Sequence, residues 1–151
     1  MNRSFLPVLL DITDLRILFV GAGEGTRVKL VALVKQNPTV RIVAPLLSHE
    51  VAVLASKLSD VQIFERPFVE ADLDDVSLVY GFTDDQALNS RLAELCRNRG
   101  LWSNIAGNRS GGSFHSPAVA RKDGVVAAFS SESGHPAVAV ASRDAWLGVK
   151  K

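Results

Sequence analysis

Short apolar runs alternate with amphipathic segments from residue 16 to residue 105. The apolar runs are rich in branched residues, which is typical of strands buried in a parallel sheet. They predict strands at residues 16–20, 40–43, 61–64, 76–82 and 101–105. Between them, apolar residues at helical spacing predict helices over 26–35, 48–58 and 84–99. Strands that alternate with helices in this way predict an α/β fold with a parallel sheet covered by helices on both faces.

The pattern changes after residue 106. Residues 107–113 form a polar, glycine-rich segment, and two further strands are predicted at 114–120 and 125–131. The connection at 121–124 ends in Asp-Gly, which favours a hairpin turn. A helix is predicted over 136–147. Because two strands alone are marginally stable in water, we expect the hairpin to pack on another surface, most naturally that of a second copy of the chain.

The first predicted strand runs directly into a glycine-rich turn, GAGEG at residues 21–25. A strand, a tight glycine turn and a helix begin a dinucleotide-binding unit, since a Cβ in the turn would keep the pyrophosphate away from the backbone N–H groups. The helix N-terminus then faces the phosphates with its dipole and its unpaired donors. The residues expected around the pyrophosphate are Gly21, Ala22, Gly23, Glu24, Gly25 and Thr26.

Two features of this turn leave an alternative open. The third glycine of the usual G-x-G-x-x-G pattern would fall at Thr26. The turn could therefore need small residues for packing alone and bind nothing. Glu24 opens the following helix, so its charge could serve only the helix dipole.

Composition narrows the function classes. The 151 residues carry a formal net charge of +1, which gives no electrostatic case for binding nucleic acid or an anionic membrane. No run approaches the ~20 apolar residues of a membrane span, and the apolar stretch that Asp11 interrupts is too short for a signal peptide. The single cysteine, Cys96, excludes an internal disulfide framework and fits a reducing cytosol. We expect a cytoplasmic protein of one domain, or of one domain with a small appendage.

Short motifs spread in order over about the whole chain resemble those of one known family. The most specific are Val-Ala-Pro-x-Leu, which begins at Val43, and Thr-Asp-Asp-x-x-Leu-Asn, which begins at Thr83. The other matching pieces are Leu6-Pro7-Val8, residues 20–24 with Lys29, Asn104-Ile105, Phe114 with Pro117-Ala118, Ser130-Ser131 and Pro136-Ala137. With these motifs the chain resembles the precorrin-2 dehydrogenase/sirohydrochlorin ferrochelatase family, the N-terminal module of sirohaem synthases.

The resemblance implies a fold, an assembly and an activity. The implied fold is a Rossmann-like dinucleotide-binding domain over residues 1–112, followed by a small C-terminal β-hairpin dimerisation region over 113–151 with a truncated helical part. Family members are homodimers whose hairpin regions exchange across the interface. The implied activity is NAD-dependent oxidation of the tetrapyrrole precorrin-2 to sirohydrochlorin in sirohaem or related haem biosynthesis. Some members also insert ferrous iron.

Ala44, Pro45 and Leu46 follow the second predicted strand, where the ribose of a bound adenosine would lie. Most NAD sites place an aspartate or glutamate there, and this chain has neither. The position therefore does not decide between NAD and NADP, and the preference for NAD comes from the resemblance. Arg41 lies inside the strand and is a poor candidate for contact with a 2′-phosphate.

Three further residues are expected at the cofactor site. Thr83 and Asn104 end the fourth and fifth predicted strands, and ligands bind at the carboxyl ends of strands in open α/β sheets. Asp84 follows Thr83 directly. It either contributes to the site or caps the next helix, where its negative charge is favourable.

The chain departs from the family pattern beside the family's active site. Gly107 stands where the family usually carries an aspartate that handles protons and binds metal, and glycine can do neither. The stretch Ser131-Glu132-Ser133-Gly134-His135 also replaces the usual glycine pair. We take His115 and Ser131 as the candidate catalytic residues, because they lie at the two ends of the predicted hairpin and histidine suits proton transfer.

Other residues near the hairpin remain alternatives. His135 and Glu132 could also fill the gap, and each histidine could equally be an ordinary surface residue. No histidine and cysteine cluster has recognisable metal spacing, so no metal ligand is assigned. Cys96 is expected in the core. The basic side chains that could attract the carboxylates of a tetrapyrrole, or be solvated loop charges, are Arg109, Arg121 and Lys122.

Three functional hypotheses follow from these patterns. The leading one is an NAD-dependent precorrin-2 dehydrogenase. The second is a diverged, non-catalytic member that binds a dinucleotide or a tetrapyrrole as a sensor, carrier or partner subunit. The third is a small Rossmann protein with an unrelated ligand.

Overall fold

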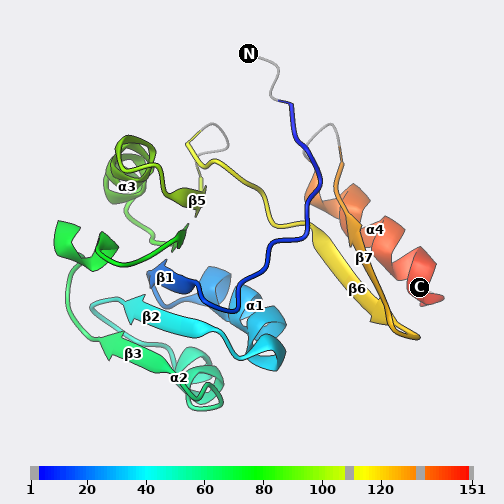
Figure 1. Cartoon of the computed structure of the whole chain (residues 1–151), viewed down its shortest axis with the longest axis horizontal. Helices are drawn as coiled ribbons and strands as arrows, with labels where there is room; N and C mark the ends of the chain where they lie inside the picture. The colour runs from blue at the N-terminus through cyan, green and yellow to red at the C-terminus, as the bar shows by residue number, and fades with distance from the viewer. Residues whose placement is uncertain (1–3, 108–110, 132–134, 150–151) are drawn as a thin grey trace. The chain divides into compact units, whose positions relative to one another are not determined.

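Five parallel strands form the central sheet in the computed structural model of the protein, in the order β3-β2-β1-β4-β5 (Figure 1). The structure describes residues 4–107, 111–131 and 135–149. The strands of this sheet are β1 (Arg16–Val20), β2 (Thr39–Val43), β3 (Val61–Phe64), β4 (Leu78–Gly81) and β5 (Trp102–Ile105). β1 is the central strand, since it pairs with both β2 and β4. The predicted Rossmann-like α/β fold is confirmed.

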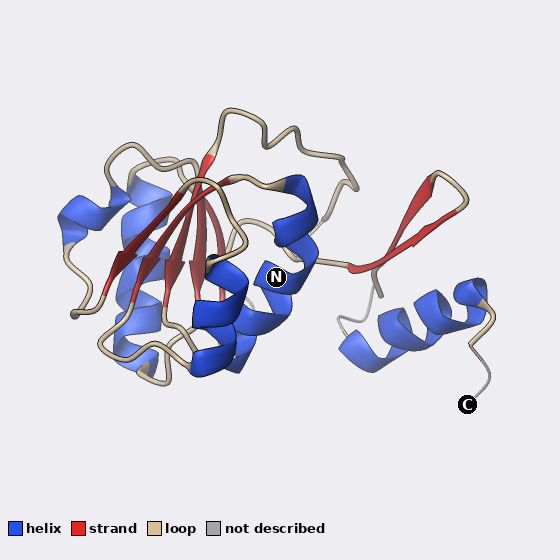
Figure 2. Ribbon diagram, turned by 90° about the horizontal axis from the view of Figure 1, so that it is seen from below, coloured by secondary structure: helices blue, strands red, loops and turns tan. Residues whose placement is uncertain are grey.

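Helices lie on either side of the sheet, as Figure 2 shows. They are α1 (Glu24–Leu33), α2 (His49–Ala55) and α3 (Gln86–Asn98), with the short 3-10 helices η1 (Val34–Gln36) and η2 (Glu70–Leu73). The helix predicted over residues 26–35 includes most of η1, whereas η2 was not predicted, because a piece this short has no periodicity of its own. Across the described ranges, no helix is both long and apolar enough to cross a membrane.

The sheet separates two apolar layers, and the residues of β1 alternate between them. Ile17 and Phe19 pack with the buried residues of α1 and α2. Leu18 and Val20 pack with those of α3. All four side chains are fully buried or nearly so. This two-sided burial explains why the strands are continuous apolar runs in the sequence rather than alternating ones.

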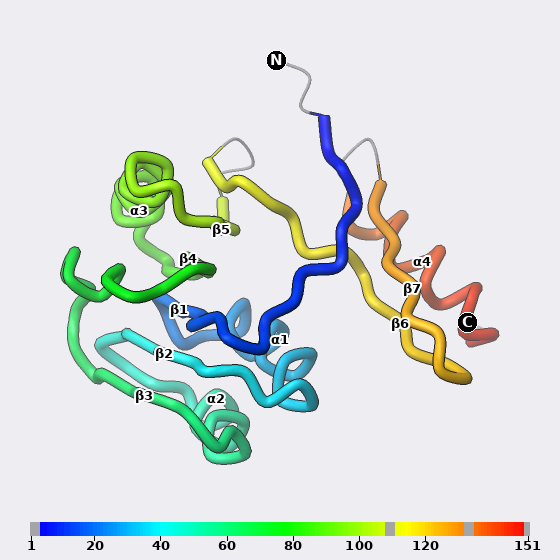
Figure 3. The backbone as a smooth tube through the Cα atoms, in the orientation of Figure 1, coloured from blue at the N-terminus to red at the C-terminus, as the bar shows by residue number. Residues whose placement is uncertain are grey.

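The chain divides into two compact units, Met1–Phe114 and His115–Lys151. Figure 3 follows the backbone through both. The second unit is an antiparallel hairpin of β6 (Ala118–Lys122) and β7 (Val125–Phe129), followed by α4 (Pro136–Leu147). Asp123 and Gly124 both have positive φ, 51° and 78°, as the predicted two-residue Asp-Gly turn requires.

The predicted start of β6 was wrong. The strand begins at Ala118 rather than at residue 114. Pro117 precedes it, and proline has no N–H for a strand ladder while it also restricts the backbone of Ser116. In the second unit α4 covers one face of the hairpin: Ala120 is buried, and the Phe129 ring lies 6.3 Å from that of Trp146.

An ionic network holds the connection between β3 and β4 against the sheet. Nη1 of Arg41 donates to the carbonyl oxygens of Asp72 at 3.0 Å and Asp74 at 3.1 Å. The Asp72 carboxylate accepts from both terminal nitrogens of Arg66, at 2.6 and 2.9 Å, and from the N–H of Val69. Burial by itself raises the pKa of Asp72, but these hydrogen bonds outweigh it and hold the pKa below its usual value.

We expect Asp72→Asn to lower the free energy of unfolding by about 2 kcal/mol at pH 7, because it leaves Arg66 without its carboxylate. A depressed pKa in the folded state gives stability that is present above the unfolded pKa of ~3.9 and is lost as pH falls through the folded value. The variant should therefore lose less stability than the wild type on acidification below about pH 4. Urea unfolding at pH 7 and at pH 3 measures both effects.

The matched control is Asp74→Asn. Asp74 pairs with Arg99 at 2.8 Å, but its side chain is 63% exposed against 5% for Asp72. An exposed pair contributes at most about 1 kcal/mol. Equal losses in the two variants would contradict a structural role for the buried pair.

Candidate functional site

The carboxyl ends of β1 and β4 mark the place where a ligand crevice is expected. The chain runs from β1 outward to β2 and β3, and then returns to the other side of β1 with β4 and β5. In an open α/β sheet, ligands bind outside the carboxyl ends of the strands at such a change of direction. The loops at this edge are the turn after β1, the segment after β2, and the starts of the loops after β4 and β5.

The three glycines of the turn after β1 differ in what a side chain at each position would meet. Gly21 has φ of +97°, and a Cβ there would lie 2.2 Å from the carbonyl oxygen of Phe82. A Cβ on Gly25 would lie 3.1 Å from the Phe82 side chain. A Cβ on Gly23 would have nothing within 4 Å. Gly21 and Gly25 are therefore needed for packing against the loop after β4, whereas Gly23 faces open space.

Thr26 takes the place of the third glycine without disturbing the turn. Its side chain is fully buried, and its hydroxyl donates to the carbonyl oxygen of Gly21 at 2.6 Å. The threonine thus satisfies a backbone acceptor of the turn and ties α1 to it. The residue that departs from the usual glycine pattern therefore stabilises the turn.

The N-terminus of α1 offers backbone donors at the turn. Gly23 is its N-cap and brings no side chain to accept from the first N–H groups. The Glu24 carboxylate instead pairs with Arg27 at 2.6 Å, and the hydrogen bond from that guanidinium lowers the pKa of Glu24. Uncapped N–H groups beside an open turn form a surface suited to an anion.

The segment after β2 places apolar residues at the same edge of the sheet. Ala44 is buried, and its N–H donates to the carbonyl oxygen of Phe64 at 3.1 Å. Pro45 is exposed, and Leu46 is 80% exposed. Arg41 points to the connection before β4, where it binds the two carbonyl groups described above. It is therefore already engaged within the protein.

Asn89 joins the loops after β4 and β5. It is fully buried in α3, and its Nδ2 donates to the carbonyl oxygens of Thr83 at 2.8 Å and Ala106 at 3.4 Å. Its Oδ1 accepts from the N–H of Thr83 at 3.3 Å and lies 2.8 Å from the Thr83 hydroxyl. Asn89 ends the Thr-Asp-Asp-x-x-Leu-Asn motif, but no role was predicted for it. The available signal was a polar residue on the apolar face of a helix, next to Leu88 and one turn before Leu92.

The capping alternative for Asp84 was wrong. The N-cap of α3 is Asp85, whose Oδ1 accepts from the N–H groups of Ala87 at 2.9 Å and Leu88 at 3.1 Å. The helix begins at Gln86, so Asp84 lies outside its first turn and is exposed. Asp84 remains beside Thr83 at the carboxyl end of β4.

The loop after β5 begins with Ala106 and Gly107, directly after Asn104 and Ile105 at the end of the strand. Asn104 is half-buried inside β5. Gly107 has φ of +70°, and a Cβ there would lie 2.5 Å from Oε1 and 2.8 Å from Nε2 of Gln86. The end of the Gln86 side chain thus occupies the space in which a side chain at residue 107 would begin.

The catalytic candidates lie in the second unit, while all cofactor candidates lie in the first. His115 is exposed. Ser131 is half-buried, and its Oγ accepts from the N–H of His135 at 3.2 Å, just before α4. Glu132 and Arg109 lie outside the described residues.

Among the residues that the structure describes, no group of three or more histidine, cysteine, aspartate or glutamate side chains could hold a metal ion. Cys96 is buried in the layer under α3, as predicted, and burial raises the pKa of its thiol to about 11. The thiol therefore stays protonated at neutral pH and is a poor nucleophile or ligand.

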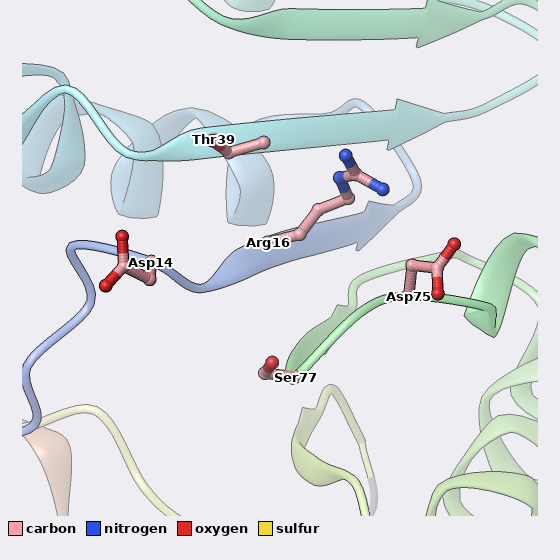
Figure 4. A pocket seen from close by; sticks show the side chains of 5 residues that line it. All are labelled: Asp14, Arg16, Thr39, Asp75 and Ser77. Carbon is pink, nitrogen blue, oxygen red and sulfur yellow. The ribbon is translucent and has the colours of Figure 1, made fainter.

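A shallow cavity of about 300 Å³ lies at the other end of the sheet (Figure 4). Arg16 and Thr39 begin β1 and β2, and Ser77 precedes β4, so the cavity lies at the amino ends of the strands. Its other lining residues are Asp14 and Asp75. It is distinct from the edge formed by the glycine turn.

Comparisons with known proteins agree with this geometry. Residues 8–118 match the family described as "Putative NAD(P)-binding". "Siroheme synthase" of Thioalkalivibrio sulfidiphilus is 30% identical over 136 residues, which cover 90% of this chain and 28% of that protein. "Siroheme synthase" of Nitrosospira multiformis is 31% identical over 136 residues, which cover 88% of this chain and 29% of that protein. The chain thus spans less than a third of the curated relatives it matches.

A solved structure shares the fold. "SirC, precorrin-2 dehydrogenase" superimposes with a TM-score of 0.79 over 97% of this chain and 72% of that chain. The sequences are 22% identical in this alignment. The likeness extends through the parallel sheet and the C-terminal hairpin.

We expect Asn89→Ala to lower the free energy of unfolding by about 3 kcal/mol, because it leaves the N–H and carbonyl groups of Thr83 and the carbonyl group of Ala106 without their partner. Asn89→Asp keeps the acceptor and loses the donor. Because a buried carboxylate has a raised pKa, this variant should regain stability as pH falls from about 7.5 to 5, where the acid can donate. Denaturant unfolding at the two pH values measures this, with the exposed Ser90→Ala as control. A loss in Asn89→Ala no larger than in Ser90→Ala would contradict the role of Asn89.

Proposed function

Because the chain belongs to the precorrin-2 dehydrogenase/sirohydrochlorin ferrochelatase family, we propose that it oxidises precorrin-2 to sirohydrochlorin with NAD as the electron acceptor. The observation that supports this most strongly is the turn after β1, which has an open side at Gly23 and uncapped N–H donors at α1. In the balanced reaction precorrin-2 loses two hydrogens, one passes as hydride to NAD, and the other is released as a proton.

The residues of the first unit fit a nicotinamide dinucleotide. We propose that the backbone of Gly21–Thr26 binds the pyrophosphate and that Ala44, Pro45 and Leu46 flank the adenosine ribose. Thr83, Asp84 and Asn104 lie at the carboxyl ends of β4 and β5 and would line the nicotinamide end of the crevice. The bound cofactor supplies hydride acceptance, and the protein orients the two reactants and keeps water away from them.

The second unit supplies the candidate proton acceptors. We propose that His115 takes the released proton and that Ser131 contributes a hydrogen bond to the substrate. Gly107 provides no ligand or base at its position, so the proposed reaction does not include iron insertion. The function that the site supports is therefore the dehydrogenation alone.

The test of this function is turnover without added metal. The purified protein is incubated with precorrin-2 and NAD, and sirohydrochlorin and NADH are followed by visible and near-ultraviolet absorption. We expect the two products to appear in equal amounts, well above the protein-free rate. Binding of NAD without product formation would contradict the dehydrogenase and favour the non-catalytic, ligand-binding hypothesis.

A substitution at Gly23 separates cofactor binding from folding. We expect Gly23→Ala to weaken NAD binding by about tenfold or more, since its methyl group would enter the space open to the phosphates. The free energy of unfolding should stay within about 1 kcal/mol of wild type, because a Cβ there meets nothing in the protein. Calorimetry and denaturant unfolding measure the two quantities.

Gly21→Ala is the contrasting variant. A Cβ at residue 21 meets the Phe82 carbonyl oxygen, so this variant should lose stability by several kcal/mol. If Gly23→Ala binds NAD as tightly as wild type, the turn is not the phosphate site.

We also propose that two copies associate through the hairpin. The face of the hairpin away from α4 carries Val119, Val126 and Ala128, with Val119 40% and Val126 41% exposed. A two-stranded sheet with an uncovered apolar face is marginal alone, which favours burial against another copy.

Val126→Lys places a second positive charge opposite Arg121 on this face, so we expect it to convert the dimer to monomer at micromolar concentration. Sedimentation velocity measures the mass. The control is Val31→Lys on α1, where the valine is 51% exposed and the dimer should persist. A wild-type monomer, or an unchanged mass for Val126→Lys, would contradict this assembly.

A further inference from the structure

Gln86 and Gly107 bring the loops after β4 and β5 together at the carboxyl edge of the sheet. Gln86 is the first residue of α3, and its side chain reaches the start of the loop after β5. The end of this side chain lies against Gly107. A Cβ on residue 107 would be 2.5 Å from Oε1 and 2.8 Å from Nε2 of Gln86. A carboxamide in this place is possible because residue 107 is glycine.

The buried Asn89 side chain holds the two segments that carry Gln86 and Gly107 together. Asn89 lies one turn after Gln86 on α3 and binds the carbonyl groups of both Thr83 and Ala106. Thr83 precedes the cap of α3, and Ala106 precedes Gly107. The two backbones that carry Gln86 and Gly107 are therefore tied to one buried side chain, which fixes the backbone from which the Gln86 side chain extends at the crevice edge.

The charges around Gln86 distinguish it from its neighbours. Asp84 and Asp85 precede it, and the Asp85 carboxylate is occupied with the N–H groups of Ala87 and Leu88. The Gln86 side chain is exposed, and within the described ranges it forms no hydrogen bond. Its Nε2 is a neutral donor beside Asp84 and Asp85, and of these three side chains only that of Gln86 can donate a hydrogen bond to an anionic group.

We propose that Gln86 is a specificity-determining residue whose side-chain N–H donates to an ionised carboxylate of the substrate. This rests on the proposed function, in which the substrate is a tetrapyrrole with many carboxylates. Gln86 positions the substrate and transfers no proton. Its contribution therefore belongs to substrate affinity, and it leaves NAD affinity and kcat unchanged.

The experiment compares Gln86→Ala and Gln86→Glu with wild type in two assays. One is turnover of precorrin-2 with NAD, and the other is binding of sirohydrochlorin, followed by its visible absorption. For Gln86→Ala we expect a rise of about tenfold in KM and in the Kd for sirohydrochlorin, the size of one lost hydrogen bond to a charged group. The kcat and the Kd for NAD should stay within about twofold. Gln86→Glu should raise KM further, because it places a negative charge against the carboxylate.

Two controls separate a contact from a general disturbance. Asn98→Ala removes an exposed carboxamide at the other end of α3 and should leave every constant unchanged. Gly107→Ala displaces the Gln86 carboxamide without removing it, and it also strains the backbone because φ of residue 107 is +70°, so it should raise KM at least as much as Gln86→Ala does. The double variant should have the KM of Gly107→Ala alone, since removing the displaced carboxamide has no further effect. Denaturant unfolding confirms that each variant is folded.

The outcomes distinguish this inference from the proposed function. Turnover in wild type with an unchanged KM in Gln86→Ala would overturn the inference alone, as would a KM of Gln86→Glu at or below that of wild type. No turnover in wild type, with sirohydrochlorin binding that depends on Gln86, would overturn the dehydrogenase alone. No binding of sirohydrochlorin to wild type would overturn the role of Gln86 in recognising a tetrapyrrole.

Discussion

The close approach of two backbones at the centre of the sheet is the constraint on which the candidate site depends. The N–H of Phe82 donates to the carbonyl oxygen of Val20 at 2.8 Å, and the Phe82 carbonyl oxygen lies where a Cβ of Gly21 would be. Only glycine allows this approach at a positive φ. It places the turn after β1 against the loop after β4, and so it forms one crevice edge from two segments that are about sixty residues apart in the sequence.

Two buried side chains also stabilise the loops at this edge. Thr26 closes the turn after β1 with a hydrogen bond to Gly21, and Asn89 joins the loops after β4 and β5. Both side chains are fully buried and polar, and each satisfies backbone groups that the sharp loops leave without regular partners. The buried polar residues of this edge thus give the loops a fixed shape. Gly23 and Gln86 face outward instead and are exposed.

The same edge shows why residue 107 carries no side chain. Gly107 adopts a left-handed conformation, and the Gln86 side chain lies in the space beside it. The group next to Gly107 is therefore a neutral carboxamide, which can form hydrogen bonds but is neither an acid nor a base at neutral pH. The proposed dehydrogenation needs mainly that two reactants be oriented, because the cofactor carries the chemistry, so a neutral group at this place is compatible with it.

Local patterns in the sequence were sufficient for the succession of strands and helices, the glycine turn and the Asp-Gly hairpin. These features depend on residues that are neighbours in the chain: apolar periodicity, the lack of a Cβ at Gly21, and positive φ at Asp123 and Gly124. The exact cap of α3 was not predictable in the same way. Two aspartates stand side by side, and only the register of the helix decides that Asp85 caps it.

The tertiary structure alone decided the roles of Thr26, Asn89 and Gln86. In the sequence, Thr26 stands where the third glycine of the usual pattern would be. Asn89 is a polar residue on an apolar helix face, and Gln86 is a surface residue. Thr26 contacts Gly21 across the turn, and Asn89 and Gln86 contact Ala106 and Gly107 in the loop after β5. Only the fold brings these residues together. Whether a polar side chain closes a loop or faces a ligand depends on which backbone groups lie within hydrogen-bond distance, and that distance is set by packing between elements rather than by the order of residues.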